Sequence, residues 1–145
     1  MSRIEESIQV KCPAEHVFSY VTNPVNLPLW ETNILKVESP PEGKLGVGVR
    51  YGGVNKTMGQ SMPWKSEVTE CEPNKRWAET ITSGNTVIHE KLTFEPVDDG
   101  TRLTMVYDMQ AGGFLKLLSP LVAGTMRRQT KGNLNRLKHI LEAQS

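Results

Sequence analysis

The stretch from residue 10 to residue 30 limits the possible folds of this chain more than any other part of it. It reads VKCPAEHVFSYVTNPVNLPLW, in which an apolar segment ends at Val10 and Pro13 follows closely. Proline suits the first turn of a helix, where its missing N–H costs nothing. Asn23-Pro24 ends that helix, because proline disfavours helical backbone in the residue before it. We therefore predict a strand and two short helices, the second over residues 25–31.

The middle of the chain has the pattern of an antiparallel meander. Apolar and polar residues alternate in several segments, and short runs rich in glycine, proline, asparagine and aspartate separate them. The predicted strands cover residues 34–39, 46–55, 61–71, 75–82, 86–96 and 101–110. Turns this short join antiparallel neighbours, since parallel strands need long crossovers.

One long amphipathic helix is predicted over residues 114–143. Apolar residues recur at three- and four-residue spacing, with Thr130 in the one gap. They are Leu115, Leu118, Val122, Met126, Leu134, Leu137 and Leu141. Ser119-Pro120 is either the start of this helix or a kink within it. We expect one α+β domain over residues 1–145, in which a seven-stranded curved sheet wraps around this helix.

Several segments resemble the SRPBCC superfamily, also called the START-like or helix-grip fold, and especially its polyketide cyclase/dehydrase-like branch. The resemblance rests on residues 12–30, on EPNKRW at 72–77, on HEKLTFEPVDDGTRLT at 89–104 and on NLNRLKHILE at 133–142. It covers nearly the whole chain and implies a deep apolar cavity between the sheet and the C-terminal helix. It leaves the function open, because the superfamily includes cyclases, lipid and sterol carriers and hormone receptors.

The phase of the strands predicts which side chains face inward. The inward sets are Val47, Val49 and Tyr51; Trp64, Ser66 and Val68; Trp77, Glu79 and Ile81; Ile88, Glu90, Leu92 and Phe94; and Leu103, Met105, Tyr107 and Met109. Four-residue turns set the register, and they place Glu90 beside both Glu79 and Tyr107, with Val68 beside Glu79. A polar row of Glu79, Glu90 and Tyr107, with Ser66 nearby, is therefore predicted to cross an apolar surface.

This polar row carries the candidate catalytic residues, Glu79, Glu90 and Tyr107. Two carboxyl groups side by side in a low-dielectric cavity cannot both ionise cheaply, so the pKa of at least one should be raised. Such a pair can act as general acid and base or can bond a ligand hydroxyl. The alternative is that one glutamate reaches water at the sheet end, or pairs with an arginine or lysine that the pattern does not identify.

The candidate ligand-binding residues come from the sheet and from the long helix. They are Trp64, Ser66, Trp77, Glu79, Glu90, Met105, Tyr107, Met109, Leu118, Val122 and Met126. Aromatic rings stack on flat ligands, and methionines adapt to varied apolar ones. Packing of the core is the alternative role for the same side chains.

Charge and motifs exclude several classes of protein. A net charge of +1 is too small to attract nucleic acid or an anionic membrane surface electrostatically. The expected partner is therefore a small hydrophobic ligand, and we expect a monomer or homodimer. His16, His89 and His139 fall on different elements, and no metal or cofactor motif is present, so no metal and no cofactor are expected. Two distant cysteines, and an N-terminus without a signal-like apolar run, favour the cytoplasm.

Three functions fit these features. The first is binding of a small hydrophobic or aromatic molecule, lipid- or polyketide-like, in the cavity. The second is a cofactor-independent enzyme of the polyketide cyclase/dehydratase kind, which the resemblance implies, using the cavity carboxyl groups or Tyr107 for acid–base chemistry. The third is a protein-interaction module that uses the apolar segment 114–122, and such a module should have a filled core.

Overall fold

The computed structural model describes residues 2–38, 41, 43, 45–57, 59–110 and 119–144, and of residues 2, 57, 110 and 119–123 the backbone alone. The strands are β1 (Ser2–Val10), β2 (Ile34–Glu38), β3 (Arg50–Thr57), β4 (Gln60–Glu72), β5 (Arg76–Ser83), β6 (Thr86–Val97) and β7 (Gly100–Gln110). The helices are α1 (Ala14–Val21), the 3-10 turn η1 (Pro24–Asn26), α2 (Leu27–Trp30) and α3 (Ser119–Gln144).

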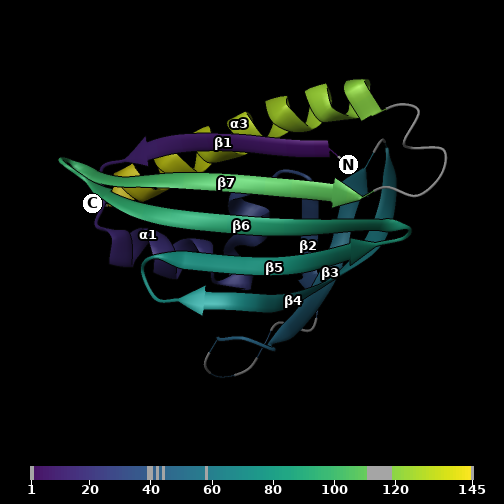
Figure 1. Ribbon diagram of the computed structural model, residues 1–145, viewed down its shortest axis with the longest axis horizontal. Coiled ribbons are helices and arrows are strands. Elements are labelled where there is room, and N and C mark those ends of the chain that lie inside the picture. Colours follow the sequence, from purple (N-terminus) through teal and green to yellow (C-terminus); the bar gives the residue numbers. More distant parts are fainter. Residues whose placement is uncertain are drawn as a thin grey trace.

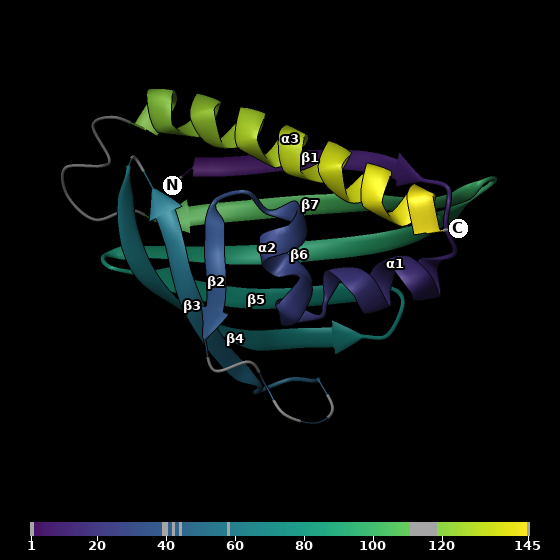
Figure 2. The ribbon, with the colours of Figure 1, turned by 180° about the vertical axis from the view of Figure 1, so that it is seen from behind.

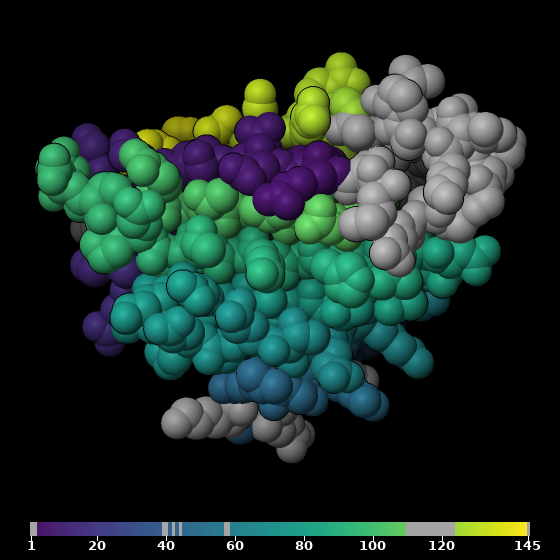
Figure 3. All heavy atoms as spheres, in the orientation of Figure 1, coloured from purple at the N-terminus to yellow at the C-terminus, as the bar shows by residue number. Residues whose placement is uncertain are grey.

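The seven strands form one antiparallel sheet in the order β1-β7-β6-β5-β4-β3-β2. The sheet is curved, and all the helices lie on its inner side, with α3 along β1 and with α1 and α2 in front of the central strands (Figures 1 and 2). The outer face carries a continuous layer of side chains over β5, β6 and β7 (Figure 3). The predicted fold class, a helix-grip arrangement with two short helices after the first strand, is confirmed.

The predicted register is confirmed at the three positions that matter for the inner face. Glu79 pairs with Glu90, Glu90 with Tyr107, and Val68 with Glu79. The pairing of Val68 with Glu79 arises differently from the expectation. The turn between β4 and β5 is one residue shorter than expected, so Glu72 pairs with Arg76. A bulge between Val68 and Glu70 then restores the expected register.

One strand prediction is wrong at its start. β3 begins at Arg50 and not at residue 46, and Val47, predicted to face inward, is 68% exposed. Gly48 has a φ of 90°, a left-handed conformation that glycine adopts readily and that breaks the extended backbone there. Val49 and Tyr51 do lie on the inner side, against the core.

The core fills the space between the sheet and the helices. Leu134, Leu137 and Leu141 of α3 are almost completely buried, as their spacing predicts. Phe18 of α1 meets the rings of Trp77 and Phe94 edge to face, with centroids 6.2 and 5.1 Å away. Residues 114–118, where the long helix was predicted to begin, lie outside the described residues. No helix in the described part of the chain is long and apolar enough to cross a membrane.

Candidate functional site

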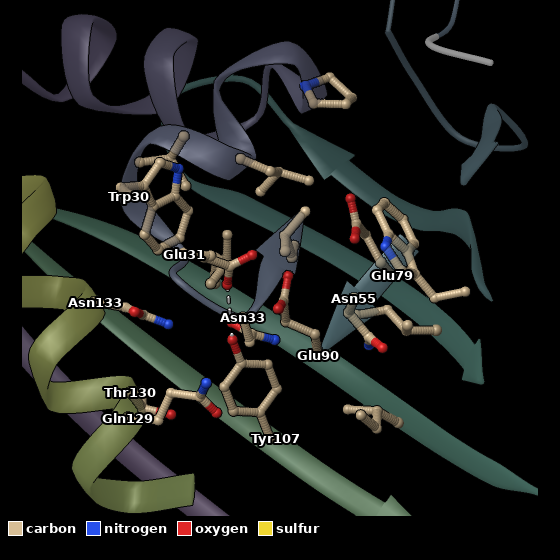
Figure 4. Close-up of a pocket in the computed structure, with 18 of the residues that line it drawn as sticks. Trp30, Glu31, Asn33, Asn55, Glu79, Glu90, Tyr107, Gln129, Thr130 and Asn133 are labelled. Carbon is tan, nitrogen blue, oxygen red and sulfur yellow. Dashed lines mark hydrogen bonds between the residues drawn. The ribbon is translucent and has the colours of Figure 1, made fainter. Parts of the chain in front are cut away.

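A cavity of about 100 Å³ lies between the inner face of the sheet and the helices. Its wall comes from strands β2 to β7, from the segment between residues 21 and 33, and from one side of α3 (Figure 4). Pockets for drug-sized ligands measure roughly 300–1,000 Å³. This cavity therefore takes a compact molecule, or one end of a longer one.

Glu79 is the most completely hydrogen-bonded carboxyl group of the wall. Its Oε1 accepts the Trp77 indole N–H at 2.8 Å and also the Tyr51 hydroxyl, and its Oε2 accepts the Ser66 hydroxyl at 3.0 Å. Burial raises the pKa of Glu79 well above its usual value, and the charges of Glu90 and Glu31 raise it further. The three donors oppose this rise, because they stabilise the ionised carboxylate. Neighbouring strands thus hold this carboxyl group in one fixed position.

Glu31 and Glu90 flank the Tyr107 hydroxyl. This hydroxyl donates to Glu31 Oε1 at 3.3 Å (Figure 4). It also lowers the pKa of Glu90 as a hydrogen-bond donor on the other side. Both glutamates are 8% exposed. Because Tyr107 has one hydroxyl proton, it can donate to only one carboxylate at a time. The carboxyl groups of Glu31 and Glu90 therefore compete for this one donor.

The pKa values follow from this burial. Burial raises the pKa of Glu31 to about 8, the charge of Glu90 adds to the rise, and the Tyr107 hydrogen bond opposes it. Burial raises the pKa of Glu90 to about 7, again against the hydrogen bond from Tyr107. The pKa of Tyr107 lies well above its usual value because of burial and of the two carboxyl groups. Near neutral pH the phenol is therefore protonated, whereas the glutamates change charge.

The backbone around α2 fixes the position of Glu31. Its N–H donates to the Leu27 carbonyl at 2.8 Å, which closes the helix, and its carbonyl accepts the Ile34 N–H at 3.1 Å. Asn133 of α3 then anchors the next residue, since its Oδ1 accepts the Thr32 N–H at 3.2 Å and the Thr32 hydroxyl at 3.3 Å. The short helix and the long helix together hold Glu31 over the sheet.

Three tryptophans form the aromatic part of the wall. Trp30, Trp64 and Trp77 are 1%, 5% and 2% exposed, and all three line the cavity. Trp64 meets Tyr51 edge to face at 5.8 Å between centroids. The indole Nε1 atoms of Trp30 and Trp64 have no hydrogen-bond partner among the described residues. Unpartnered buried donors are uncommon in proteins, so these two mark unused hydrogen-bonding capacity.

The structure brings most of the predicted site residues together and leaves others apart. Trp64, Trp77, Glu79, Glu90, Tyr107 and Met126 line the cavity. Ser66 stands behind Glu79, and Met105 and Met109 are buried in the inner face but are not part of the cavity wall. Leu118 and the side chain of Val122 lie outside the described residues, as does most of the segment 114–122.

The sequence reasoning missed Glu31 and the amide side chains of the wall. Glu31 follows a four-residue helix, where neither strand alternation nor a long helical period assigns a face. Its only signal was its place beside Trp30. Tyr51 was predicted to face inward, but its hydrogen bond to Glu79 was not. Asn33, Asn55 and Asn133 also line the cavity.

The alternative readings of the two predicted glutamates can be tested against their surroundings. Both side chains are buried, so neither reaches bulk water at the sheet end. Within the described ranges, no ion pair includes Glu79 or Glu90. The expected rise in pKa is found for both groups. In the same ranges, no group of three or more His, Cys, Asp or Glu residues could hold a metal ion.

A curved antiparallel sheet that grips a long helix around a cavity defines a helix-grip protein. Residues 1–142 match the family described as polyketide cyclase/dehydrase and lipid transport, and the chain belongs to this family. The membership confirms the resemblance that the sequence motifs indicated.

Individual relatives agree with this assignment. An uncharacterised 17.2 kDa protein of Streptomyces lincolnensis is 27% identical over 143 residues, which is 98% of this chain and 91% of that protein. A crystal structure from Thermus thermophilus has a TM-score of 0.83 at 20% identity and covers 99% of both chains. The Zhui aromatase/cyclase of a Streptomyces species has a TM-score of 0.78 at 16% identity, over 97% of this chain and 93% of that one. At these identities the structural likeness shows the fold alone.

Proposed function

We propose that the protein binds a small, mainly apolar or aromatic molecule in the cavity between the sheet and α3. The observation that carries this proposal is the composition of the cavity wall. Aliphatic and aromatic side chains from several elements make up about half of the lining, and polar groups that include Glu31, Glu90 and Tyr107 converge on the same space. Apolar walls with a few placed polar groups are typical of small-molecule sites. The family description, which includes lipid transport, supports the same proposal.

Native mass spectrometry of the freshly purified full chain tests for a bound molecule. The expected result is an extra mass that is lost on denaturation. Ile88→Phe should abolish it, because Ile88 lines the cavity and the larger ring fills the space. Val87→Phe is the matched control, since the neighbouring residue on a strand points to the opposite face of the sheet. Equal retention of the bound mass by the two variants would argue against the cavity as the binding site.

The second candidate is an acid–base enzyme of the cyclase or dehydratase kind that the family description names. The observation that favours it is the position of Glu90, whose pKa is about 7 and which bonds Tyr107 at the cavity wall. A group with a pKa near the working pH is the most efficient general acid or base. The cavity would hold one end of a poly-β-keto chain while a proton moves between that end and the carboxyl group.

Glu90→Gln separates the two candidates. The amide has nearly the shape of the carboxyl group but cannot exchange a proton. An enzyme that acts on a poly-β-keto thioester should lose turnover and keep binding, whereas a carrier has no turnover to lose. If neither Glu79→Gln nor Glu90→Gln changes binding or its pH profile, neither glutamate contacts the ligand and the acid–base role is wrong.

Three expectations from the sequence remain proposals. They are a single domain over residues 1–145, a cytoplasmic location and a monomeric or homodimeric state. The family match over residues 1–142 supports the first of them.

A further inference from the structure

The side of α3 that faces the cavity carries two buried polar side chains. Thr130 and Asn133 are three residues apart, so they are neighbours on one face of the helix. They are 5% and 6% exposed, and both line the cavity (Figure 4). Buried polar groups almost always bond to protein, water or ligand. The bonds that these two side chains make, and those that they lack, therefore indicate what the cavity holds.

The hydroxyl of Thr130 has no hydrogen-bond partner among the described residues. A helical threonine often donates to the carbonyl four residues earlier, as Thr22 does to Phe18 at 2.7 Å. Thr130 makes no such bond within the described part of α3. Its oxygen is not fully enclosed by protein, in contrast to the unpartnered indole nitrogens of Trp30 and Trp64. This hydroxyl is therefore open to an occupant of the cavity.

The amide group of Asn133 is oriented by Thr32. The Thr32 N–H donates to Asn133 Oδ1 at 3.2 Å, and a backbone N–H can only donate, so the amide oxygen must lie on this side. The Nδ2 atom then points into the cavity, toward the side that carries Tyr107 (Figure 4). It has no partner among the described residues and brings two N–H donors. α3 thus presents two unused donor groups side by side.

The sheet and α2 bring acceptors to the same cavity. Glu79 is occupied, because it already accepts three hydrogen bonds. Glu31 and Glu90, the carboxyl pair, compete for the one hydroxyl proton of Tyr107. An ionised carboxylate has about four acceptor sites, so most of the capacity of this pair is unused. An occupant that fits must accept from α3 and donate to the carboxyl pair.

A hydroxyl is the smallest group that does both, because it donates one hydrogen bond and accepts two. An ammonium group only donates, and a ketone only accepts. We propose that the ligand carries an uncharged hydroxyl group on an apolar body, which accepts from Thr130 and Asn133 and donates to the carboxyl pair. This inference rests on the proposed binding function. A water molecule has the same hydrogen-bonding capacity, so a ligand hydroxyl replaces it without loss, whereas a methyl group does not.

Phenol and toluene test the proposal, because they have nearly the same size and toluene carries a methyl group in place of the hydroxyl. NMR chemical-shift changes of the full chain measure the affinity of each. Thr130→Val removes the hydroxyl and nearly keeps the shape of the side chain. It should weaken phenol about three- to tenfold, the effect of one hydrogen bond, and change toluene by less than about twofold.

Two further variants are matched to Thr130→Val. Thr130→Ser keeps the hydroxyl and should keep the wild-type ratio of phenol affinity to toluene affinity. Thr125→Val removes an exposed hydroxyl from the same helix and should change neither affinity. Equal effects of Thr130→Val on the two probes would overturn the hydroxyl proposal and leave cavity binding intact.

Thermal unfolding without ligand separates a ligand contact from a structural one. Thr130→Val should have an unchanged or raised Tm, because its hydroxyl has no partner among the described residues. A clear fall in Tm would show that this hydroxyl is needed within the protein and would overturn the proposal. Binding of neither probe to the wild type would overturn it as well, and absence of a bound mass in native mass spectrometry would then also overturn the proposed function.

A measurement on the wild-type protein needs no variant that might fail to fold. With phenol bound, the ring protons next to its hydroxyl should show stronger NOEs to the Thr130 methyl group than the opposite ring proton does. This order is expected because the hydroxyl lies against Thr130 and Asn133. The reverse order would place the hydroxyl away from α3 and would overturn the proposal.

Discussion

At the scale of single residues, the cost of burying three carboxyl groups in one small cavity is offset in two ways. Glu79 is surrounded by donors from Tyr51, Ser66 and Trp77, which oppose the cost of its burial. Glu31 and Glu90 share the hydroxyl of Tyr107, and their pKa values rise to about 8 and about 7. The donors hold the Glu79 side chain in place, although burial raises its pKa as well.

The raised pKa values make stability depend on pH. The unfolded chain releases the protons of Glu31 and Glu90 near pH 4.5, whereas the folded protein keeps them until about pH 7 to 8. Stability that is fully present below pH 4.5 is therefore lost as the pH rises through the folded values. For Glu90 alone the loss is at most about 3 kcal/mol.

Urea unfolding at a series of pH values measures this loss. Glu90→Gln should flatten the fall in the free energy of unfolding above about pH 5.5, because the amide does not titrate. Glu95→Gln serves as the control and should retain the wild-type slope, since its side chain is exposed. Identical slopes for wild type and Glu90→Gln would show that the pKa of Glu90 is not raised in the folded protein.

Tyr107→Phe tests the shared hydroxyl directly. The hydrogen bond from Tyr107 lowers the pKa of both Glu31 and Glu90 against the effect of burial. Its removal should raise the titration midpoint of Glu90 above about 7, as followed by ¹³C NMR of the side-chain carboxyl groups. Tyr20→Phe is the control, because Tyr20 does not line the cavity. A lowered midpoint in Tyr107→Phe would contradict the arrangement.

At the scale of elements, the sequence predicts best where a period repeats. Alternation in β6 and β7, together with the short turn between them, placed Glu90 opposite Tyr107 correctly. It failed at Val47, because Val47 and Gly48 form the centre of a turn that alternation does not reveal. It could not find Glu31, since the four-residue α2 is too short to have a period. The sheet half of the site was thus predictable, and the half contributed by the short helix was not.

Two glycines in different elements should respond oppositely to alanine. A Cβ at Gly100 would collide with the Val10 carbonyl and lie 2.9 Å from both Cys12 N and Lys11 Cα. Gly100→Ala should therefore destabilise the protein by about 1–3 kcal/mol, as overpacking usually does. A Cβ at Gly132 in α3 meets nothing within 4 Å, so Gly132→Ala should stabilise by about 0.5–1 kcal/mol. Thermal unfolding compares the two, and a stabilising Gly100→Ala would contradict the close approach of β1 and β7.

Asn133 connects α3 to the segment that carries Glu31. Asn133→Ala removes both hydrogen bonds from Thr32 to Asn133 Oδ1, at 3.2 and 3.3 Å. Because a partly buried backbone N–H then lacks its partner, we expect a loss of about 1–3 kcal/mol in the free energy of unfolding. Asn135→Ala is the control, since Asn135 is exposed on the same helix. Equal losses in urea unfolding would show that the Thr32 contact does not contribute.

At the scale of the whole molecule, one core connects every part of the described structure that surrounds the cavity. The buried cluster includes Phe18 from α1, Trp30 from α2, residues of the sheet, and Leu137 from α3. The cavity is thus a gap left inside that core, and its wall belongs to elements that depend on one another for burial. A chain of this kind should unfold as one unit.

Coincident unfolding transitions test this unity. Trp30, Trp64 and Trp77 all lie in the single core cluster, so their fluorescence reports the packing around the cavity. Far-UV circular dichroism reports the whole sheet and all the helices. In urea the two signals should give the same midpoint and the same slope, because no part of the described sheet or of α3 has a second core on which to remain folded. If the fluorescence changed at lower urea than the dichroism, the cavity region would open separately, and the expectation of one cooperative domain would be wrong.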